Sequence, residues 1–326
     1  MENTMSRTLL PLTIFTALMG GIALAEVPRV AADIAPIHSL VARVMEGVGT
    51  PEMIVQLGGS PHEYSLRPSE AEALQEADLV FWVSPDLTPW LDSAIETLAT
   101  RASVTELLEA EGTIELEMRE GALFEVHKHG EDEQEGGDHV EGKYDDEAGH
   151  EDHDNHGAHD PHAWLSPQNA KTWLNVIASQ LSAADPGNAE AYLANATTGR
   201  AELDTLTSDI NAMLAPVRGG QFIVFHDAYQ YFESAFEFTA SGAISISDAS
   251  DPSPARITEI RTRIAAEGID CVLAEPQFNE GLVATVLDGT DANTGVLDPL
   301  GSDLKPGSAL YPQLMRNLAS TLVKCM

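Results

Sequence analysis

The sequence has 326 residues, about twice the length that one hydrophobic core usually serves, so its length indicates two domains. Its 17 basic and 52 acidic residues give a formal net charge of −35, which repels nucleic-acid phosphates and anionic lipid headgroups. We therefore expect no nucleic-acid partner. Hydrophobic residues make up 43% of the chain, which is enough for a buried core, so part of the excess acidity must be local.

The N-terminal segment has the pattern of a cleaved export signal. Arg7 gives it a positive start, residues 9–23 are apolar, and Ala23-Leu24-Ala25 matches a cleavage signature, so we expect cleavage after Ala25. The alternative, an N-terminal membrane anchor, needs roughly 20 apolar residues and is disfavoured. No cysteine follows the expected cleavage site for attachment of a lipid. These features predict a soluble protein in the periplasm of a Gram-negative cell.

Short apolar runs alternate with helical stretches along the mature chain, which is typical of βαβ units and parallel sheets. In its first part we expect strands at 27–33, 53–57, 78–83 and 103–107 and helices at 38–46, 68–76, 89–100 and 167–184. Beyond Pro216 the pattern resumes, with helices between predicted strands at 221–225, 243–246, 270–274 and 295–297. The sequence therefore predicts two α/β units.

Residues 188–215 form the longest uninterrupted helical pattern in the chain. At 1.5 Å per residue such a helix is about 42 Å long, which is longer than a small lobe is wide. We expect a linker helix (188–216) between an N-terminal α/β lobe (26–187) and a C-terminal α/β lobe (217–326), after the signal peptide (1–25).

An acidic segment, Glu125–Asp160, interrupts the first lobe. It contains 14 acidic residues, seven histidines and six glycines, but no Leu, Ile, Phe, Met or Trp. Burial cannot offset the entropy of ordering such a segment, so we expect a mobile loop. Its histidines are His127, His129, His139, His150, His153, His156 and His159.

Three other histidines, His62, His162 and His226, each lie where a predicted strand ends or a helix is about to begin. Ligands of open α/β sheets bind beyond the carboxyl ends of the strands, so these side chains can converge. Imidazole suits Zn²⁺ and Cu²⁺, and a tetrahedral site needs a fourth ligand. Asp298 follows a predicted strand and is the first candidate, with Glu275 a weaker one. Taken singly, each histidine also fits a capping or packing role.

Four segments resemble the metal-site segments of one protein family: GSPHEYSLRP at 59–68, DPHAWLSP at 160–167, FHDAYQYF at 225–232 and LDPLG at 297–301. The family is the zinc-uptake group of the cluster A-I substrate-binding proteins of ABC transporters. The similarity covers the mature chain in the right order, including an acidic His-rich insertion before the second segment.

The resemblance implies an α/β fold of two lobes with mostly parallel sheets, joined by one long, rigid linker helix. It implies that His62, His162 and His226 bind the metal, with Asp298 where manganese-binding relatives place a carboxylate. Some relatives carry a Glu before the first histidine, but this chain has Pro61 there. The fourth ligand therefore stays open between Asp298 and a water molecule.

The resemblance also implies a disulfide between Cys271 and Cys325, which the chain-entropy model values at about 4 kcal/mol; the alternative is two buried thiols. The histidines of Glu125–Asp160, which are interleaved with carboxylates, fit a weak zinc collector or a sensor of zinc abundance. A solvated acidic linker with incidental histidines is the other interpretation.

The function implied is that of a periplasmic receptor that captures Zn(II) as its substrate between two lobes. It would deliver the ion to a membrane permease driven by a cytoplasmic ATPase, since the chain has no P-loop. A periplasmic zinc chaperone is a further candidate partner, and we expect a monomer. A Mn(II) or Fe(II) receptor is the alternative, although three imidazoles favour zinc. A zinc hydrolase is disfavoured because H-E-x-x-H and G-x-S-x-G motifs are absent, so we expect no enzyme.

Overall fold

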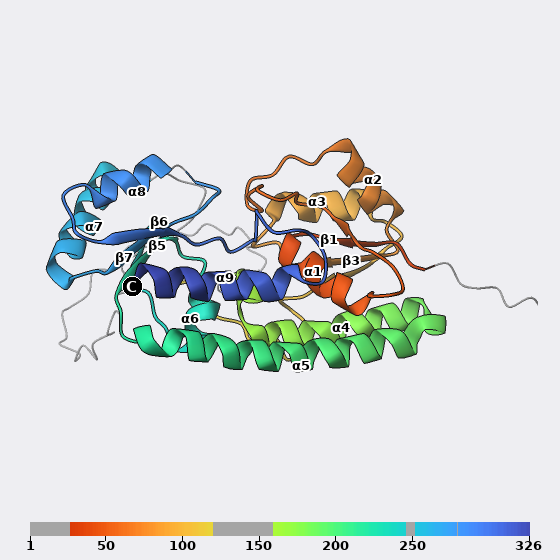
Figure 1. Ribbon diagram of the computed structural model, residues 1–326. Coiled ribbons are helices and arrows are strands. Elements are labelled where there is room, and N and C mark those ends of the chain that lie inside the picture. The colour runs from red at the N-terminus through yellow and green to blue at the C-terminus, as the bar shows by residue number, and fades with distance from the viewer. Residues whose placement is uncertain (1–26, 120–158, 246–251, 279) are drawn as a thin grey trace, which may run out of the picture.

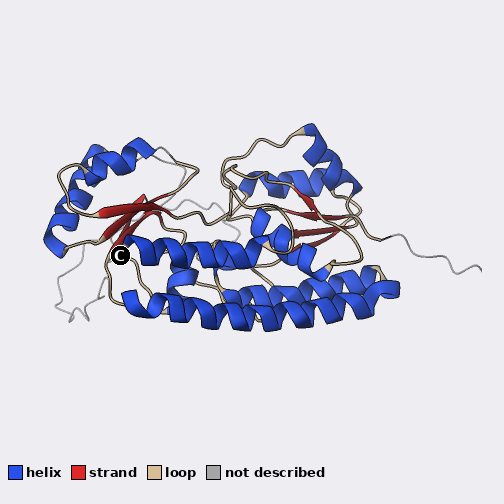
Figure 2. Cartoon of the chain, in the orientation of Figure 1, coloured by secondary structure: helices blue, strands red, loops and turns tan. Residues whose placement is uncertain are grey.

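The computed structural model describes residues 27–119, 159–245, 252–278 and 280–326. The expected signal peptide and most of the acidic segment lie outside the described residues. Within these ranges the chain forms two four-stranded parallel sheets, each with helices on both sides (Figures 1 and 2). The strand order is β2-β1-β3-β4 in the first sheet and β6-β5-β7-β8 in the second. The two-lobed parallel α/β fold expected from the sequence is therefore confirmed.

The first lobe alternates strands and helices. Its strands are β1 (Val30–Ala32), β2 (Glu52–Met53), β3 (Leu79–Trp82) and β4 (Ser103–Glu106), and its helices are α1 (Ala35–Val44), α2 (Pro68–Glu76), α3 (Pro89–Leu98) and α4 (Pro167–Ala184). Helices α2, α3 and α4 begin with proline, whose fixed φ and missing N–H suit the first turn. The Ser166 hydroxyl caps α4 by accepting a hydrogen bond from the Asn169 N–H.

Both faces of the central strands β1 and β3 of the first sheet are buried, and β3 shows how its sequence achieves this. Leu79 and Phe81 point into the main core, while Val80 and Trp82 point into a second cluster beneath α2 and α3. Strands covered on both faces need apolar residues at every position instead of alternation. The sheet thus lies between two layers of helices. The edge at the carboxyl ends of its strands is the part that can bind a ligand.

The second lobe repeats this plan. Its strands are β5 (Phe222–His226), β6 (Gly242–Ser245), β7 (Cys271–Ala274) and β8 (Asn293–Val296), and its helices are α6 (Gln230–Phe236), α7 (Pro254–Glu267), α8 (Glu280–Leu287) and α9 (Leu310–Cys325). Short 3₁₀ turns lie at Ala163–Leu165, Pro186–Asn188 and Ala215–Val217.

Helix α5 (Ala189–Leu214) has 26 residues and runs beneath both lobes in Figure 1. It packs along α4 and contacts α1 and α9. One hydrophobic cluster includes buried side chains from both sheets, from α5 and from α9. The lobes therefore share a continuous core.

Two predicted strands differ from the observed ones. Strand β2 ends at Met53, although Ile54 and Val55 still donate N–H bonds to the chain leaving β1; the backbone then turns at Gly58, whose φ is 81°. The strand predicted at 295–297 begins earlier, since β8 pairs Asn293 with the start of β7.

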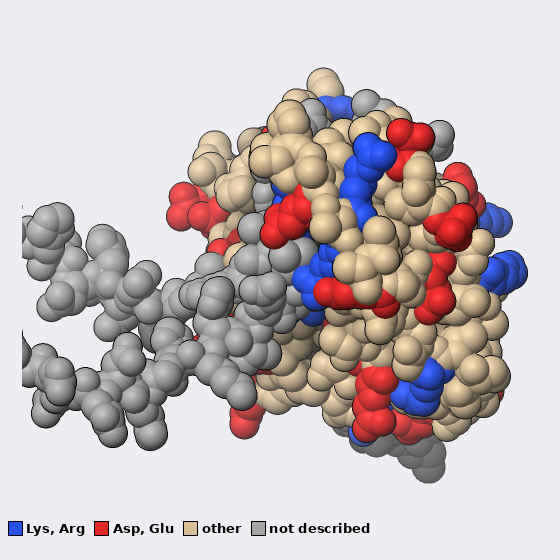
Figure 3. Space-filling view, turned by 90° about the vertical axis from the view of Figure 1, so that its left-hand side faces the viewer, with Lys and Arg blue, Asp and Glu red and all other residues tan. Residues whose placement is uncertain are grey.

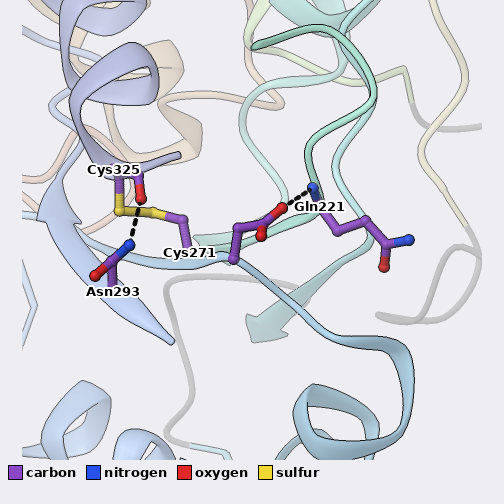
Figure 4. Close-up of a disulfide and its surroundings, with 5 residues drawn as sticks. Gln221, Cys271, Asn293 and Cys325 are labelled. Atoms are coloured by element: carbon purple, nitrogen blue, oxygen red, sulfur yellow. Dashed lines mark hydrogen bonds between the residues drawn. A yellow bond between two sulfur atoms is a disulfide. The ribbon is translucent and has the colours of Figure 1, made fainter. Parts of the chain in front are cut away.

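A disulfide joins Cys271 at the start of β7 to Cys325 at the end of α9 (Figure 4). The Asn293 side-chain amide donates to the Cys325 carbonyl at 2.9 Å. The expected bridge is confirmed, and it fastens the end of α9 to the second sheet.

Charges of both signs share the surface at the end of the second lobe, where Lys and Arg lie among Asp and Glu (Figure 3). Three arginines of α7 have nearby carboxylates, in the pairs Arg256–Glu259, Arg263–Glu267 and Arg261–Asp288. None of the described helices is both long and apolar enough to cross a membrane.

Candidate metal centre

Three imidazoles converge between the lobes. His62 comes from the loop after β2, His162 from the turn before α4, and His226 is the last residue of β5. Each offers a ligand nitrogen, and these atoms all lie within 4.8 Å of one another. The Nε2 atoms of His162 and His226 are 3.4 Å apart. Two nitrogens bound to a tetrahedral zinc at about 2.0–2.1 Å stand about 3.3 Å apart, so this spacing suits zinc.

His162 is oriented by the carboxylate two residues before it. Its Nδ1 lies 2.7 Å from Asp160 Oδ1, which also accepts the His162 backbone N–H at 3.0 Å. With its proton on Nδ1, the ring presents the lone pair of Nε2 to the site. Burial, and next the proximity of His226, hold the pKa of His162 well below its usual value. The imidazole therefore stays neutral, as a metal ligand must be.

His226 is held in the same way from the neighbouring strand. Its Nδ1 lies 2.8 Å from Glu275 Oε1, and Glu275 directly follows β7, the partner of β5. Both side chains are buried. Glu275, expected as a minor candidate ligand, lies behind the imidazole instead. The sequence signal for this role is its position at the end of the adjacent strand.

His62 is half-buried and lies in a loop that is fixed on either side of it. The Trp90 indole N–H donates to the Pro61 carbonyl at 2.7 Å. After the histidine, the Tyr64 hydroxyl donates to Glu70 at 2.8 Å. A Cβ at Gly59 would come within 2.8 Å of the Tyr64 ring, so this close approach requires glycine.

Apolar side chains surround the cluster. The pocket that holds the three histidines is also lined by Trp164, Phe278, Pro299 and Leu300. The Trp164 indole N–H donates to the Pro299 carbonyl at 2.8 Å and so joins the two lobes beside the site. Such a lining lowers the local dielectric and so strengthens electrostatic interactions between a cation and the carboxylates behind the imidazoles.

Most of the chain matches a known family. A family model described as "Zinc-uptake complex component A periplasmic" matches residues 30–325. The chain belongs to the ZnuA family. The high-affinity zinc uptake system protein ZnuA of Brucella abortus is 50% identical over 304 residues, which cover 91% of each chain. That of Paracoccus denitrificans is 43% identical over 317 residues, 96% of this chain and 97% of its own.

A crystal structure of ZnuA has the same fold, with a TM-score of 0.71 at 21% identity over 92% of this chain and 99% of its own. The resemblance to a zinc-uptake binding protein is therefore confirmed. ZnuA proteins are periplasmic substrate-binding components of zinc transporters, and the three converging imidazoles of this chain could hold such a metal substrate.

In this ZnuA-family chain, Asp298 does not belong to the group of converging ligand atoms. Its carboxylate instead accepts the backbone N–H groups of Leu300, Gly301 and Ser302, at 3.0, 3.0 and 2.6 Å. These bonds close the turn after β8. The orientation of the Asp298 carboxylate is thus set by its own turn.

Of the seven expected auxiliary histidines, the structure describes His159. It forms an antiparallel bridge with Glu117, and its Nδ1 lies 3.6 Å from a Glu115 carboxylate oxygen. It does not join the three converging histidines. The other six lie outside the described residues.

Proposed function

We propose that this protein is a periplasmic receptor that captures one Zn²⁺ between its lobes through His62, His162 and His226. The observation that carries the proposal is the convergence of these three ligand nitrogens, with a spacing of 3.4 Å across the lobes. The ion is the cargo, and it would pass to the membrane permease of an ABC transporter driven by a cytoplasmic ATPase.

For the fourth ligand we propose a water molecule. The hydrogen bonds that Asp298 accepts from its own turn support this choice. Three neutral imidazoles and a water favour zinc over Mn²⁺ and Fe²⁺, which prefer more oxygen ligands.

We propose no catalytic role, although three histidines and a water also occur in zinc hydrolases. The carboxylates of Asp160 and Glu275 contact the Nδ1 atoms, on the far side of the imidazoles from Nε2. They hold the ligands, and neither is placed as a base on a metal-bound water.

The remaining assignments are proposals from the sequence: export with cleavage after Ala25, a monomeric state, and a division into lobes 26–187 and 217–326 joined by 188–216. A periplasmic zinc chaperone is proposed as a further partner. The seven histidines from His127 to His159 are proposed to bind additional zinc weakly.

A competition titration of zinc against a chelator tests the central proposal. His226→Ala should weaken binding at least about tenfold, because it removes one of three protein ligands. His38→Gln is the matched control: His38 is buried away from the site, where its Nε2 lies 3.1 Å from the Pro51 carbonyl oxygen. Unchanged affinity of His226→Ala would reject the site, and weakened affinity of the control would show that the assay reports on folding.

A further inference from the structure

Arg119 forms the densest group of ion pairs between the two lobes within the described residues. The arginine follows the first-lobe strand β4 by thirteen positions in the chain, whereas its partners, Asp227 and Glu233, belong to the second lobe. Its Nε lies 3.0 Å from both Asp227 oxygens, and its terminal nitrogens lie 2.8 and 3.0 Å from the two Glu233 oxygens. One guanidinium thus donates hydrogen bonds to both oxygens of two carboxylates.

Both carboxylates belong to the segment that follows His226, so their bonds to Arg119 restrain the position of this histidine. Asp227 directly follows His226, and Glu233 lies in α6, the helix that begins three residues later. Their side chains are only 8% and 4% exposed. The two negative charges are nearly hidden from water, so they depend on the arginine for compensation.

The segment that carries Arg119, residues 114–119, is also hydrogen-bonded to Asp160, beside His162. We call this segment the strap. The N–H of Leu116 donates to the Tyr231 hydroxyl of α6 at 2.9 Å, and the Leu116 carbonyl accepts the N–H of Asp160 at 2.8 Å. Asp160 is the carboxylate that orients His162. The strap is therefore bonded on one side to the support of His162 and on the other to α6.

A side chain of α6 completes this connection. With its amide assigned so that the nitrogen donates, Gln230 lies 3.2 Å from the Glu117 carbonyl of the strap and 3.1 Å from Asp160 Oδ2. Hydrogen bonds thus join Asp160, the support of His162, to α6 and to the strap, and Arg119 of the strap bonds to Asp227, the residue after His226.

We propose that Arg119 is a positioning residue of the metal centre: by clamping Asp227 and Glu233 to the strap, it sets the separation of His162 and His226 and thereby the affinity for zinc. This inference rests on the proposed function. A centre whose ligands already stand at zinc spacing loses less freedom on binding, so the clamp should slow release of the ion. The fork geometry matters because a lysine ammonium cannot engage both carboxylates bidentately.

The chain offers a close control in Arg43. Its side chain is 13% exposed, compared with 16% for Arg119, and it also pairs with two carboxylates. Arg43 grips Glu202 through both oxygens, at 2.8 and 3.0 Å, and also contacts Glu46. These contacts join α1 to α5, and none of them involves a residue beside the histidines.

The experiment compares Arg119→Gln, Arg119→Lys, Arg43→Gln and Arg43→Lys in the full chain. Zinc affinity is measured by chelator competition, zinc release by stopped flow, and the melting temperature without zinc by calorimetry. We expect both Arg119 variants to bind zinc at least about fivefold more weakly, mainly through faster release. Both Arg43 variants should stay within twofold of the wild type.

Rescue by lysine separates positioning from stabilisation. Arg119→Lys keeps the charge that the two buried carboxylates require, so it should recover most of the melting temperature that Arg119→Gln loses, but not the affinity. If Arg119→Gln does not fold, the zinc affinity of Arg119→Lys tests the inference alone. Wild-type affinity in a folded Arg119 variant, or full recovery of affinity by lysine, would overturn the inference.

Wild-type protein and His226→Ala are titrated alongside. Equal binding by these two would reject the proposed function itself. Tight binding by the wild type, loss in His226→Ala and no loss in either Arg119 variant would reject only the role of Arg119.

Discussion

The Nε2 atoms of His162 and His226 stand 3.4 Å apart, although 64 positions separate the two residues in sequence. Each ring has a carboxylate on its Nδ1 side, Asp160 for His162 and Glu275 for His226. The spacing that zinc requires is thus present without the ion, and each Nδ1 has a carboxylate to which it can donate its proton. This relationship leads to the first two predictions.

Removal of either supporting carboxylate should weaken zinc binding. Asp160→Asn and Glu275→Gln keep the side-chain shape but make the imidazole a poorer electron donor, and losses of about tenfold or more are usual for such partners. Asp185→Asn is a suitable control, because Asp185 is also buried. Its carboxylate accepts a hydrogen bond from the Tyr192 hydroxyl and contacts none of the three histidines. Wild-type affinity in both Asp160→Asn and Glu275→Gln would contradict the supporting role.

Asp298→Asn should change zinc affinity by less than about threefold, because the proposed fourth ligand is a water. A structure of the zinc-loaded protein would test this directly: a water oxygen, and no Asp298 oxygen, should lie about 2.0–2.2 Å from the ion. An Asp298 oxygen at that distance, with a large loss in Asp298→Asn, would favour the carboxylate alternative.

Asp33 should make the zinc-free protein less stable as the pH rises. Burial raises the pKa of Asp33 from 3.8 to about 7, against the lowering effect of the Val83 and Ile34 N–H groups. Between these values the folded protein holds a proton that the unfolded chain releases, so this contribution to stability is full below pH 4 and is lost by about pH 7. Between pH 5 and 7 the loss is about 2–3 kcal/mol.

Urea unfolding of zinc-free wild type and Asp33→Asn at several pH values measures this effect. The variant cannot titrate, so its unfolding free energy should fall less steeply with pH than that of the wild type. Parallel curves for the two proteins would show that Asp33 stays ionised throughout.

Deleting residues 125–158 should preserve the tight zinc site and abolish weaker binding. The deletion spares Asp160, whose carboxylate lies 2.7 Å from His162 Nδ1. Calorimetric titration should show one tight site in both proteins and additional weak sites only in the full chain. A full-length variant with the histidines of 125–158 replaced by Asn is the control, and it should behave like the deletion. Loss of the tight site in either protein would mean that this segment supplies a primary ligand.

Position relative to strand ends was the sequence signal that predicted the histidine cluster. It held directly for His226, the last residue of β5. His62 lies in the loop after β2 and His162 in the turn before α4, and the three converge. The same rule pointed to Glu275 and Asp298 but could not rank them, since a residue at a strand end can face the ligand, an imidazole or its own turn. Which one it faces depends on side-chain directions that a sequence pattern does not contain.

Arg119 gave no comparable signal. Its partners lie 108 and 114 positions away along the chain, and no periodicity or motif connects them. A lone arginine at the border of an acidic segment looks like a solvated charge until the fold brings α6 beside it. Ion pairs between distant segments are consequences of tertiary structure, and sequence patterns predict them poorly.

Helix α9 has a consequence for the order in which the chain can fold. It is the last helix in the sequence, yet it packs against α1, the first helix of the described residues, and the Tyr311 N–H donates to the Ser39 hydroxyl at 2.9 Å. During synthesis the first lobe emerges long before this helix, so part of its apolar surface must wait uncovered for nearly the whole chain. The nascent chain must therefore be kept from aggregating until residues 310–325 have been synthesised. A truncation that removes these residues should leave both lobes prone to aggregate.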